Sequence, residues 1–231
     1  IQDMNQQKKS LLSVHIAVLG FGLSGLFAKL VGQPAIVIAW GRVVFSSIFL
    51  FILLKARRQS ITLNSRRDYL LLASAGILLA IHWTTFMQSI QVATVAVGTL
   101  TFSTYPLFVT FLEPYFYHEK LQKSDVVCAL IMLAGVMLIV PEFHLDNSMT
   151  QGVIWGMIGS LSYALLSLMN RRFSGKYPGT LVSLYEQGTA ALVLFPALFI
   201  LLPAFTARDI AGLLILGIAF TAGSHSLFIS G

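Results

Sequence analysis

The sequence predicts an all-α protein that crosses a membrane many times. Of its 231 residues, 56% are hydrophobic and 10% are charged, whereas soluble domains carry about 25% charged residues. The mean hydropathy of +0.81 points the same way. Because this number of charges is too small to cover a surface that faces water, lipid must be the main solvent. A helix satisfies its own backbone hydrogen bonds in lipid, and the apolar runs have the length of spanning helices.

Eight apolar runs are candidates for spanning helices. A bilayer core of about 30 Å requires about 20 apolar residues in helical conformation. The runs cover residues 11–31, 35–54, 69–90, 95–117, 126–140, 153–169, 180–202 and 210–230. The chain begins at Ile1 and ends at Gly231 inside an apolar run. We therefore expect a fragment of a longer protein.

The charges of the loops predict the orientation, because positively charged loops stay on the cytoplasmic side. One side holds Lys8, Lys9, Lys55, Arg57, Arg58, Arg66, Arg67, Lys120, Lys123, Arg171, Arg172 and Lys176. The opposite loops hold Glu142, Asp146 and Asp209, with Arg208 as their one clear cation. The prediction is a cell (inner) membrane protein with a cytoplasmic N-terminus. The net charge of +6 is thereby explained without a nucleic acid partner.

Two stretches of the chain resemble each other. Residues 34–42 and 178–186 each begin with a proline and end with a charge, Arg42 in the first and Glu186 in the second. Gly76 and Gly217 then recur in the third run of each half. The first half has five runs, so a second copy must enter the membrane upside down, which is typical of transporters. We predict two inverted five-helix repeats, at 11–142 and 152–231. The second contains three of its helices here, and the full-length protein has ten.

Four segments carry a resemblance to a known family. They are residues 34–42, 101–109, 119–121 and 134–138. With them the chain resembles the EamA-type members of the drug/metabolite transporter superfamily, although His118 stands where that family often has glycine. The resemblance implies a bundle of two inverted repeats that exports or exchanges amino acids or related metabolites. It implies a transporter and not an enzyme, with no cofactor.

Two charges lie deep inside predicted helices. Arg42 is roughly 10 Å from the outer edge and Glu186 roughly 12 Å from the inner edge, at 1.5 Å per residue. A charge at this depth costs at least about 2.5–3.5 kcal/mol, so it faces a cavity or a partner. We interpret Arg42 as an anchor for a substrate carboxylate and Glu186 as a site for an amine or a proton. The alternatives are a structural ion pair, or Glu186 reaching the cytoplasmic interface.

The remaining candidate site residues are polar or aromatic. In the fourth run, positions at helical spacing predict a cavity-lining face: Thr99, Ser103, Pro106, Thr110 and Glu113. Pro106 should break this helix by freeing the carbonyl of Phe102. Ser and Thr bonding back to their own helix is the alternative. His82, Trp83 and His225 are candidates for substrate contact or proton relay, or for hydrogen-bonded packing.

A rival class is an intramembrane serine protease. Residues 22–25 match the Gly-x-Ser-Gly pattern of rhomboid-type proteases, with Ser24 as nucleophile and His82 or His225 as base. His225 lacks the Ala-His-x-x-Gly context of that family. A receptor or structural role is a further alternative. The predicted partners are a small-molecule substrate and the lipid bilayer, with protons as a candidate coupling ion and a homodimer as a candidate assembly. No metal site is predicted, since Cys128 is the single cysteine and no ligand set is present.

Overall fold

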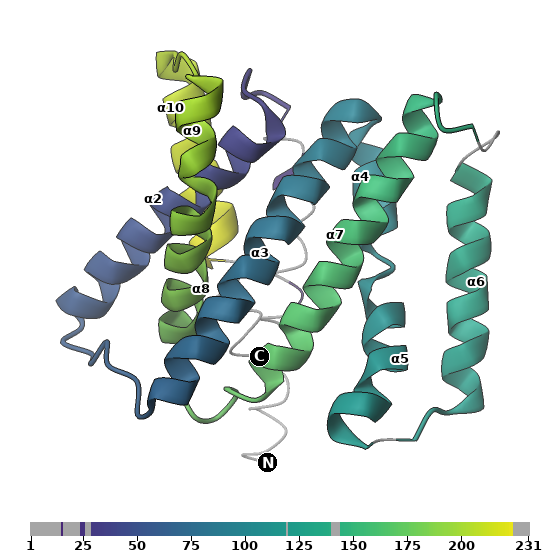
Figure 1. The fold of residues 1–231 in the computed structure, drawn as a ribbon, viewed down its shortest axis with the longest axis horizontal. Helices are drawn as coiled ribbons and strands as arrows, with labels where there is room; N and C mark the ends of the chain where they lie inside the picture. The colour runs from purple at the N-terminus through teal and green to yellow at the C-terminus, as the bar shows by residue number, and fades with distance from the viewer. Residues whose placement is uncertain (1–14, 16–23, 26–28, 119, 140–143, 224–231) are drawn as a thin grey trace.

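The computed structural model is a bundle of long helices that run side by side (Figure 1). It describes residues 15, 24–25, 29–118, 120–139 and 144–223, and these contain no strand. The helices are α2 (Ala35–Ala56), α3 (Arg66–Val92), α4 (Val95–Phe102), α5 (Tyr105–Tyr117), α6 (Lys123–Ile139), α7 (Ser148–Arg171), α8 (Gly179–Leu194), α9 (Pro196–Leu201), α10 (Ala207–Ile215) and the π-helical η1 (Leu216–Gly223). The predicted all-α class is therefore confirmed for the described residues.

The predicted runs from the second to the seventh coincide with helices or joined helix pairs. Five of these in the described chain are long and apolar enough to cross a membrane: Ala35–Ala56, Arg66–Val92, Val95–Tyr117, Ser148–Arg171 and Gly179–Leu201. The described part of α6 has 17 residues. Most of the first run and the end of the eighth lie outside the described residues, so the ten-helix count stays a prediction.

Several helices begin earlier than the apolar runs that predicted them. Helix α3 starts at Arg66 because the side chain of Ser65 accepts a hydrogen bond from the backbone N–H of Asp68. Helix α7 starts at Ser148 because Asn147 accepts from the N–H of Met149. Such caps satisfy the free N–H groups of a first turn. Hydropathy marks only the part of a helix that lipid surrounds, whereas capped first turns extend into the polar interface.

The fourth predicted run is broken, as Pro106 predicted. Helix α4 ends at Phe102, and Pro106 lies in the first turn of α5. Ser160 of α7 stabilises the break, because its hydroxyl lies 2.8 Å from the carbonyl oxygen of Thr101 and 3.0 Å from that of Phe102. Carbonyls that lose their helical donors therefore find a donor on a neighbouring helix, as irregular backbone inside a membrane requires.

The centre of the bundle is built by close helix contacts. Helix α3 packs against α7 and α8, and α2 packs against α8 and η1 (Figure 1). Small residues let α7 approach α3 and α4: a Cβ added at Gly152 would lie 2.4 Å from the Cβ of Ala93. A Cβ at Gly156 would lie 2.8 Å from the Cβ of Thr101. In lipid, such small residues are what allows helix backbones to pack closely.

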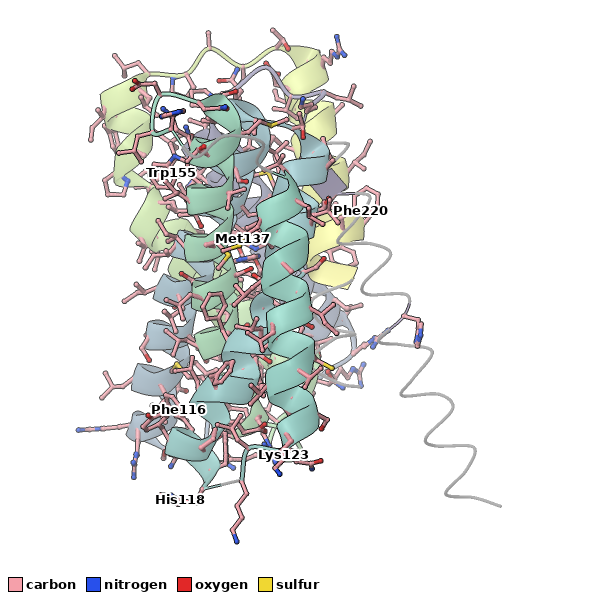
Figure 2. The ribbon with its side chains drawn as sticks, turned by 90° about the vertical axis from the view of Figure 1, so that its right-hand side faces the viewer. Phe116, His118, Lys123, Met137, Trp155 and Phe220 are labelled. Carbon is pink, nitrogen blue, oxygen red and sulfur yellow. The ribbon has the colours of Figure 1, made fainter. Side chains whose placement is uncertain are left out.

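The outer surface of the bundle is apolar and its interior holds polar groups. Leu138, Leu192 and Ile200 are 86%, 76% and 80% exposed, whereas Arg42 and Glu186 are fully buried. This arrangement suits a protein surrounded by lipid. The two ends of the bundle differ in charge. We call the end that carries Arg66, Arg67, Lys123, Arg171, Arg172 and Lys176 the basic end, and the opposite one the far end; Figure 2 shows Lys123 near the first and Trp155 toward the second.

Replacing Gly152 with alanine should destabilise the bundle. The new methyl group would overlap Ala93, and overpacking of this kind typically costs about 1–3 kcal/mol of unfolding free energy. Gly188 of α8 has no other atom within 4 Å of an added Cβ. Gly188→Ala should therefore be neutral or stabilising by up to about 1 kcal/mol, the difference in helix propensity. Thermal unfolding in detergent compares the two variants, and equal shifts would contradict the packing argument.

Candidate functional site

Arg42 is the buried cation of the site. It lies on α2, eight residues after Pro34, the residue that precedes the helix. Its side chain is fully buried, and its Nε donates a hydrogen bond of 2.9 Å to the hydroxyl oxygen of Thr221. Its guanidinium carbon lies 3.4 Å from the centre of the Trp83 ring. A guanidinium this close to an indole face gains a cation–π interaction of about 0.5–2 kcal/mol.

These contacts leave part of the guanidinium unused. Neither Nη nitrogen of Arg42 has a hydrogen-bond partner among the described residues. Arg42 is therefore not hydrogen-bonded to Glu186 here. A buried donor without a partner costs about 1–3 kcal/mol, and more when it is charged. The site thus holds two parallel N–H donors ready for an acceptor, and this fork matches the geometry of a carboxylate.

Thr221 presents its acceptor from an irregular helix. It lies in η1, where the backbone is π-helical instead of α-helical. Its hydroxyl donates to the carbonyl oxygen of Leu216 at 2.7 Å, so its lone pairs remain available to Arg42. π-Helical turns are rare and occur often at functional sites. In the sequence, Thr221 is a single threonine within an apolar run, and nothing there indicates its role.

An aromatic group surrounds His82 on α3. The centre of its ring lies 4.7 Å from that of Trp83, 5.0 Å from that of Phe102 and 4.8 Å from that of Tyr163. The imidazole is fully buried, and its Nδ1 is 3.0 Å from the carbonyl oxygen of Gly159 on α7. These contacts are those of a hydrogen-bonded packing residue. Its role in a proton relay stays a prediction.

Glu186 lies on α8 with a fully buried side chain. The idea that it reaches the cytoplasmic interface is therefore wrong. Its carboxylate is close enough to Tyr163 of α7 to interact electrostatically with the phenol. Gln187, the next residue, is also fully buried, and its side-chain oxygen and nitrogen have no hydrogen-bond partner in the described part of the chain. Sequence reasoning missed Gln187, although the cost of a polar group in lipid applies to it as well.

Contacts connect these residues into one group, which we call the central polar cluster. Thr221 binds Arg42, Arg42 stacks on Trp83, and ring contacts continue through His82 to Tyr163. Glu186 is near enough to act electrostatically on the Tyr163 phenol. The members of the cluster are Arg42, His82, Trp83, Tyr163, Glu186 and Thr221. Four of the six were predicted from the sequence. They come from α2, α3, α7, α8 and η1, so the cluster forms only when these helices pack together.

The predicted polar face of the fourth run does not join this cluster. Thr99 and Ser103 donate to the carbonyl oxygens of Val95 and Thr99 in their own helix, at 2.8 and 2.9 Å. Ser103 and Pro106 are exposed. The back-bonding alternative thus describes Thr99 and Ser103 as they stand. That the face lines a cavity remains a prediction.

Thr110 and Glu113 lie lower on α5, nearer the basic end. Both line a cavity of about 190 Å³ between α5 and the start of α6. The carboxylate of Glu113 forms an ion pair with Arg171, the last residue of α7. Glu113 therefore bridges two helices near the interface, and it does not reach the centre of the bundle.

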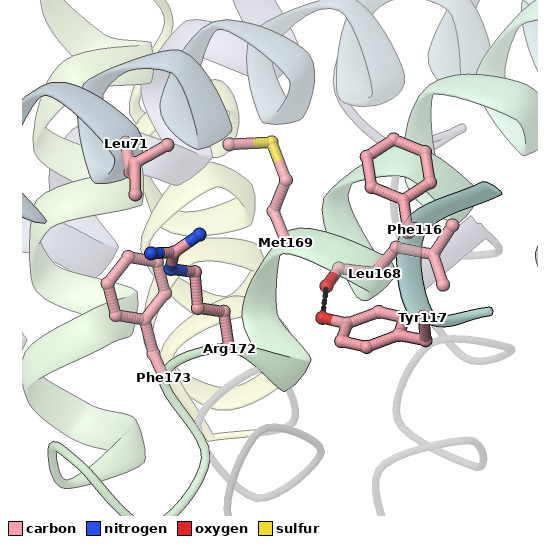
Figure 3. Close-up of a pocket in the computed structure, with 7 residues that line it drawn as sticks. All are labelled: Leu71, Phe116, Tyr117, Leu168, Met169, Arg172 and Phe173. Atoms are coloured by element: carbon pink, nitrogen blue, oxygen red, sulfur yellow. Dashed lines mark hydrogen bonds between the residues drawn. The ribbon is translucent and has the colours of Figure 1, made fainter. Parts of the chain in front are cut away.

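A second pocket opens at the basic end between α3, α5 and α7 (Figure 3). It has a volume of about 270 Å³ and is lined by Leu71, Phe116, Tyr117, Leu168, Met169, Arg172 and Phe173. The hydroxyl of Tyr117 donates to the carbonyl oxygen of Leu168 at 2.7 Å and closes one side. Its walls are mostly apolar and face the side of the bundle. None of its residues belongs to the central polar cluster.

The predicted serine–histidine pair stays untested. Ser24 is fully buried. His225 lies outside the described residues, and His82 directs Nδ1 toward Gly159. The described residues hold no group of three or more His, Cys, Asp or Glu side chains placed to bind a metal ion.

Comparison with known proteins identifies the family. The model of the EamA-like transporter family matches residues 8–140, which is more than half of the chain. The chain belongs to this family. The resemblance seen in the sequence is therefore confirmed, together with the multi-pass membrane character of the chain.

Individual relatives of this family are distant. The uncharacterized transporter YxxF of Bacillus subtilis (strain 168) is 26% identical over 196 residues, which cover 83% of this chain and 62% of the relative. The S-adenosylmethionine uptake transporter of Rickettsia bellii (strain RML369-C) is 25% identical over 194 residues, 83% of this chain and 64% of the relative. The chain thus spans less than two thirds of the length of these relatives. A crystal structure with 17% identity aligns with a TM-score of 0.72 over 96% of this chain and 77% of its own, which shows a shared fold.

Replacing Thr221 with valine should weaken the site's architecture. Valine keeps the shape of threonine but removes the acceptor of Arg42 Nε, and a hydrogen bond to a charged group contributes about 1.5–3 kcal/mol. Thr85→Val is the matched control, because the Thr85 hydroxyl donates to the carbonyls of Ile81 and His82 in its own helix. Thermal unfolding of both variants in detergent is the measurement. A larger loss for Thr85→Val would show that Arg42 does not depend on Thr221.

Proposed function

We propose that the full-length protein is a secondary transporter for small metabolites that carry a carboxylate, such as amino acids and their derivatives. The observation that carries this proposal is the fully buried Arg42, whose two Nη nitrogens have no partner among the described residues. An uncompensated guanidinium in lipid is expensive, so it is retained where an anion binds. A carboxylate that accepts both N–H bonds would compensate it.

Glu186 supplies the second half of the proposed site. A zwitterionic amino acid has an amine as well as a carboxylate, and a buried carboxylate attracts that amine. Trp83 and Tyr163 provide flat apolar surface beside the two charges. The relative named as an S-adenosylmethionine uptake transporter acts on an amino-acid derivative, which supports this substrate class. Export, exchange and uptake can use one such site, because the gradients decide the direction.

The contacts between α3 and α8 support the proposal of two inverted halves. A Cβ added at Gly76 of α3 would lie 2.8 Å from the backbone oxygen of Glu186 and 2.5 Å from the Cβ of Thr189. The glycine therefore packs directly on the helix that carries the deep charge of the other half. It contacts the backbone oxygen of Glu186 and the side chain of Thr189, three positions later.

The other half repeats this contact. A Cβ added at Gly217 of η1 would lie 2.8 Å from the backbone oxygen of Arg42 and 2.7 Å from the Cβ of Phe45. The contacted positions are again the deep charge and the residue three positions later. Such reciprocity is expected when two repeats are related by a two-fold axis in the membrane plane. It supports repeats at 11–142 and 152–231 and ten helices in the whole protein.

Alternating access follows from this arrangement. Each half would rock against the other about the central polar cluster, which opens the site to one side of the membrane at a time. The loop cations favour a cytoplasmic location for the basic end. The membrane would then be the inner membrane of the cell. The N-terminus would then be cytoplasmic. Protons as coupling ion and a homodimer as assembly remain part of the proposal.

Arg42→Gln should reduce transport strongly. The loss of charge-assisted hydrogen bonds to a carboxylate corresponds to roughly a 10- to 100-fold lower rate at low substrate concentration. Uptake of labelled amino acids and S-adenosylmethionine into liposomes that contain the full-length protein is the measurement. Arg172→Gln is the control, since Arg172 is exposed at the basic end and should leave the rate unchanged. Methyl esters of the transported compound should fail to compete, and full transport by Arg42→Gln would refute the carboxylate site.

Glu186→Gln tests the role of the second charge. If the carboxylate binds an amine, the variant should lose transport of zwitterions by about 10-fold or more, because a charged partner is replaced by a neutral one. If it carries a proton, transport by the variant should no longer respond to a pH gradient. Asp146→Asn is the control, because Asp146 is exposed in the loop that precedes α7. A variant with normal rates and a normal pH response would exclude Glu186 from the mechanism.

A further inference from the structure

Two aspartates hold the ends of the bundle together. The first is Asp68 at the basic end. Its Oδ2 accepts a hydrogen bond of 2.7 Å from the Nζ of Lys176 and another of 2.7 Å from the hydroxyl of Tyr177. Asp68 is only 4% exposed. It belongs to α3, whereas Lys176 and Tyr177 belong to the connection between α7 and α8. We call this set the Asp68 clasp.

The second is Asp209 at the far end. Its Oδ1 accepts a bond of 2.9 Å from the N–H of Gly32, and its Oδ2 accepts one of 3.0 Å from the side-chain amide of Gln33. It is 4% exposed. It belongs to α10, whereas Gly32 and Gln33 immediately precede Pro34 and α2. We call this set the Asp209 clasp.

The two clasps occupy matching positions. Each aspartate is the third residue of its helix, and the backbone N–H of each donates to the side chain of its own N-cap residue: that of Asp68 to Ser65, and that of Asp209 to Thr206. Each aspartate binds the residue directly before the proline that precedes the second helix of the other half. Tyr177 takes this place in one clasp, and Gln33 in the other. The relation between the clasps is thus the same as that between the Gly76 and Gly217 contacts.

We propose that these clasps are the two gates of the transport cycle. Each ties one half of the protein to the other at one end, so each must break when the site opens to that side. This inference rests on the proposed alternating access, in which the two ends open in turn. Both clasps are intact here, and both carboxylates are nearly buried, as in a state closed at both ends. Opening an end exchanges the bonds of its aspartate for bonds to water.

The chemistry of the two gates differs. Asp68 pairs with the ammonium of Lys176, whose side chain is 43% exposed, so salt can screen this gate. Asp209 has only neutral donors within the described part of the chain. Hydrogen bonds from the backbone and hydroxyl of Thr206, from Gln33 and from Gly32, led by the Thr206 N–H, hold the pKa of Asp209 well below its usual range. It therefore stays ionised at physiological pH.

Cysteine labelling can read each gate separately. Ala39 and Ser183 lie five residues after Pro34 and Pro178, and both are fully buried, so they are matched reporters for the far end and the basic end. Each would be changed to cysteine in a full-length protein that carries Cys128→Ser. A membrane-impermeant maleimide is then applied from either side of oriented vesicles, without substrate. The gate variants are Asp68→Asn and Asp209→Asn.

Asp68→Asn should raise the labelling rate of the reporter at 183 about 10-fold, since it weakens bonds to a charged group, and leave the reporter at 39 unchanged or slower. Asp209→Asn should do the reverse. Asp125→Asn is the charge-matched control, because within the described residues Asp125 bonds only its own segment, at Gln122 and Ser124. Tyr177→Phe and Gln33→Met should give smaller changes of the same sign, and they replace the Asn variants if those fail to fold.

Other outcomes overturn the proposal. No change, or equal acceleration at both reporters, would show that the clasps stabilise the fold without acting as gates. Because labelling needs no substrate, it separates this inference from the proposed function. One-sided opening in a protein that transports none of the tested metabolites would retain the gates and reject the substrate class. Transport of these metabolites with unchanged labelling in every variant would retain the substrate class and reject the gates.

Discussion

The buried guanidinium of Arg42 constrains how the helices of this membrane protein pack. Arg42 is bound by Thr221 at one nitrogen and covered by the Trp83 ring on one face. Each of these contacts requires a particular helix in a particular place, with η1 and α3 pressed against α2. The charge therefore acts as a constraint on packing as well as a candidate ligand site. Removing the charge from water costs free energy, and polar contacts inside the bundle offset this cost.

That polar interior is possible because the helices approach closely elsewhere. Glycines at 152 and 156 let α7 lie against α3 and α4, and Gly76 and Gly217 bring backbones together beside the two deep charges. Apolar side chains such as Leu138 and Ile200 are directed outward into lipid. Without a hydrophobic force between helices in a membrane, such close contacts and interhelical hydrogen bonds hold the bundle. Ser160 provides one example, since it serves the carbonyls that the break before Pro106 leaves free.

Much of the fold could be predicted from the sequence because lipid imposes simple rules. Long apolar runs gave the helices, and Pro106 gave the break in the fourth run. Arg42 and Glu186 were found because charges inside such runs require an explanation. Family membership followed from local motifs. Helix starts were less well predicted, since caps such as Ser65 and Asn147 lie outside the apolar stretch.

The composition of the site was harder to predict. Tertiary packing alone brings three residues next to the buried charges: Tyr163, Gln187 and Thr221. A single polar residue in an apolar helix does not indicate which residues of other helices it will contact. The face from Thr99 to Glu113 shows the converse. Helical spacing predicts that these residues share one side, but spacing does not tell whether a hydroxyl bonds within its own helix, as that of Ser103 does.

The glycine contacts between the halves have a mechanical consequence. At Gly76 and Gly217 one helix has no side chain of its own at the contact, so its main chain lies against a backbone oxygen and a Cβ of the other helix. Two interlocked side chains must leave their rotamers before two surfaces can turn, whereas a glycine has no side chain to disengage. The two halves can therefore pivot at these glycines, which lie beside Arg42 and Glu186. A small tilt about such a point moves the ends of the bundle most and its centre least.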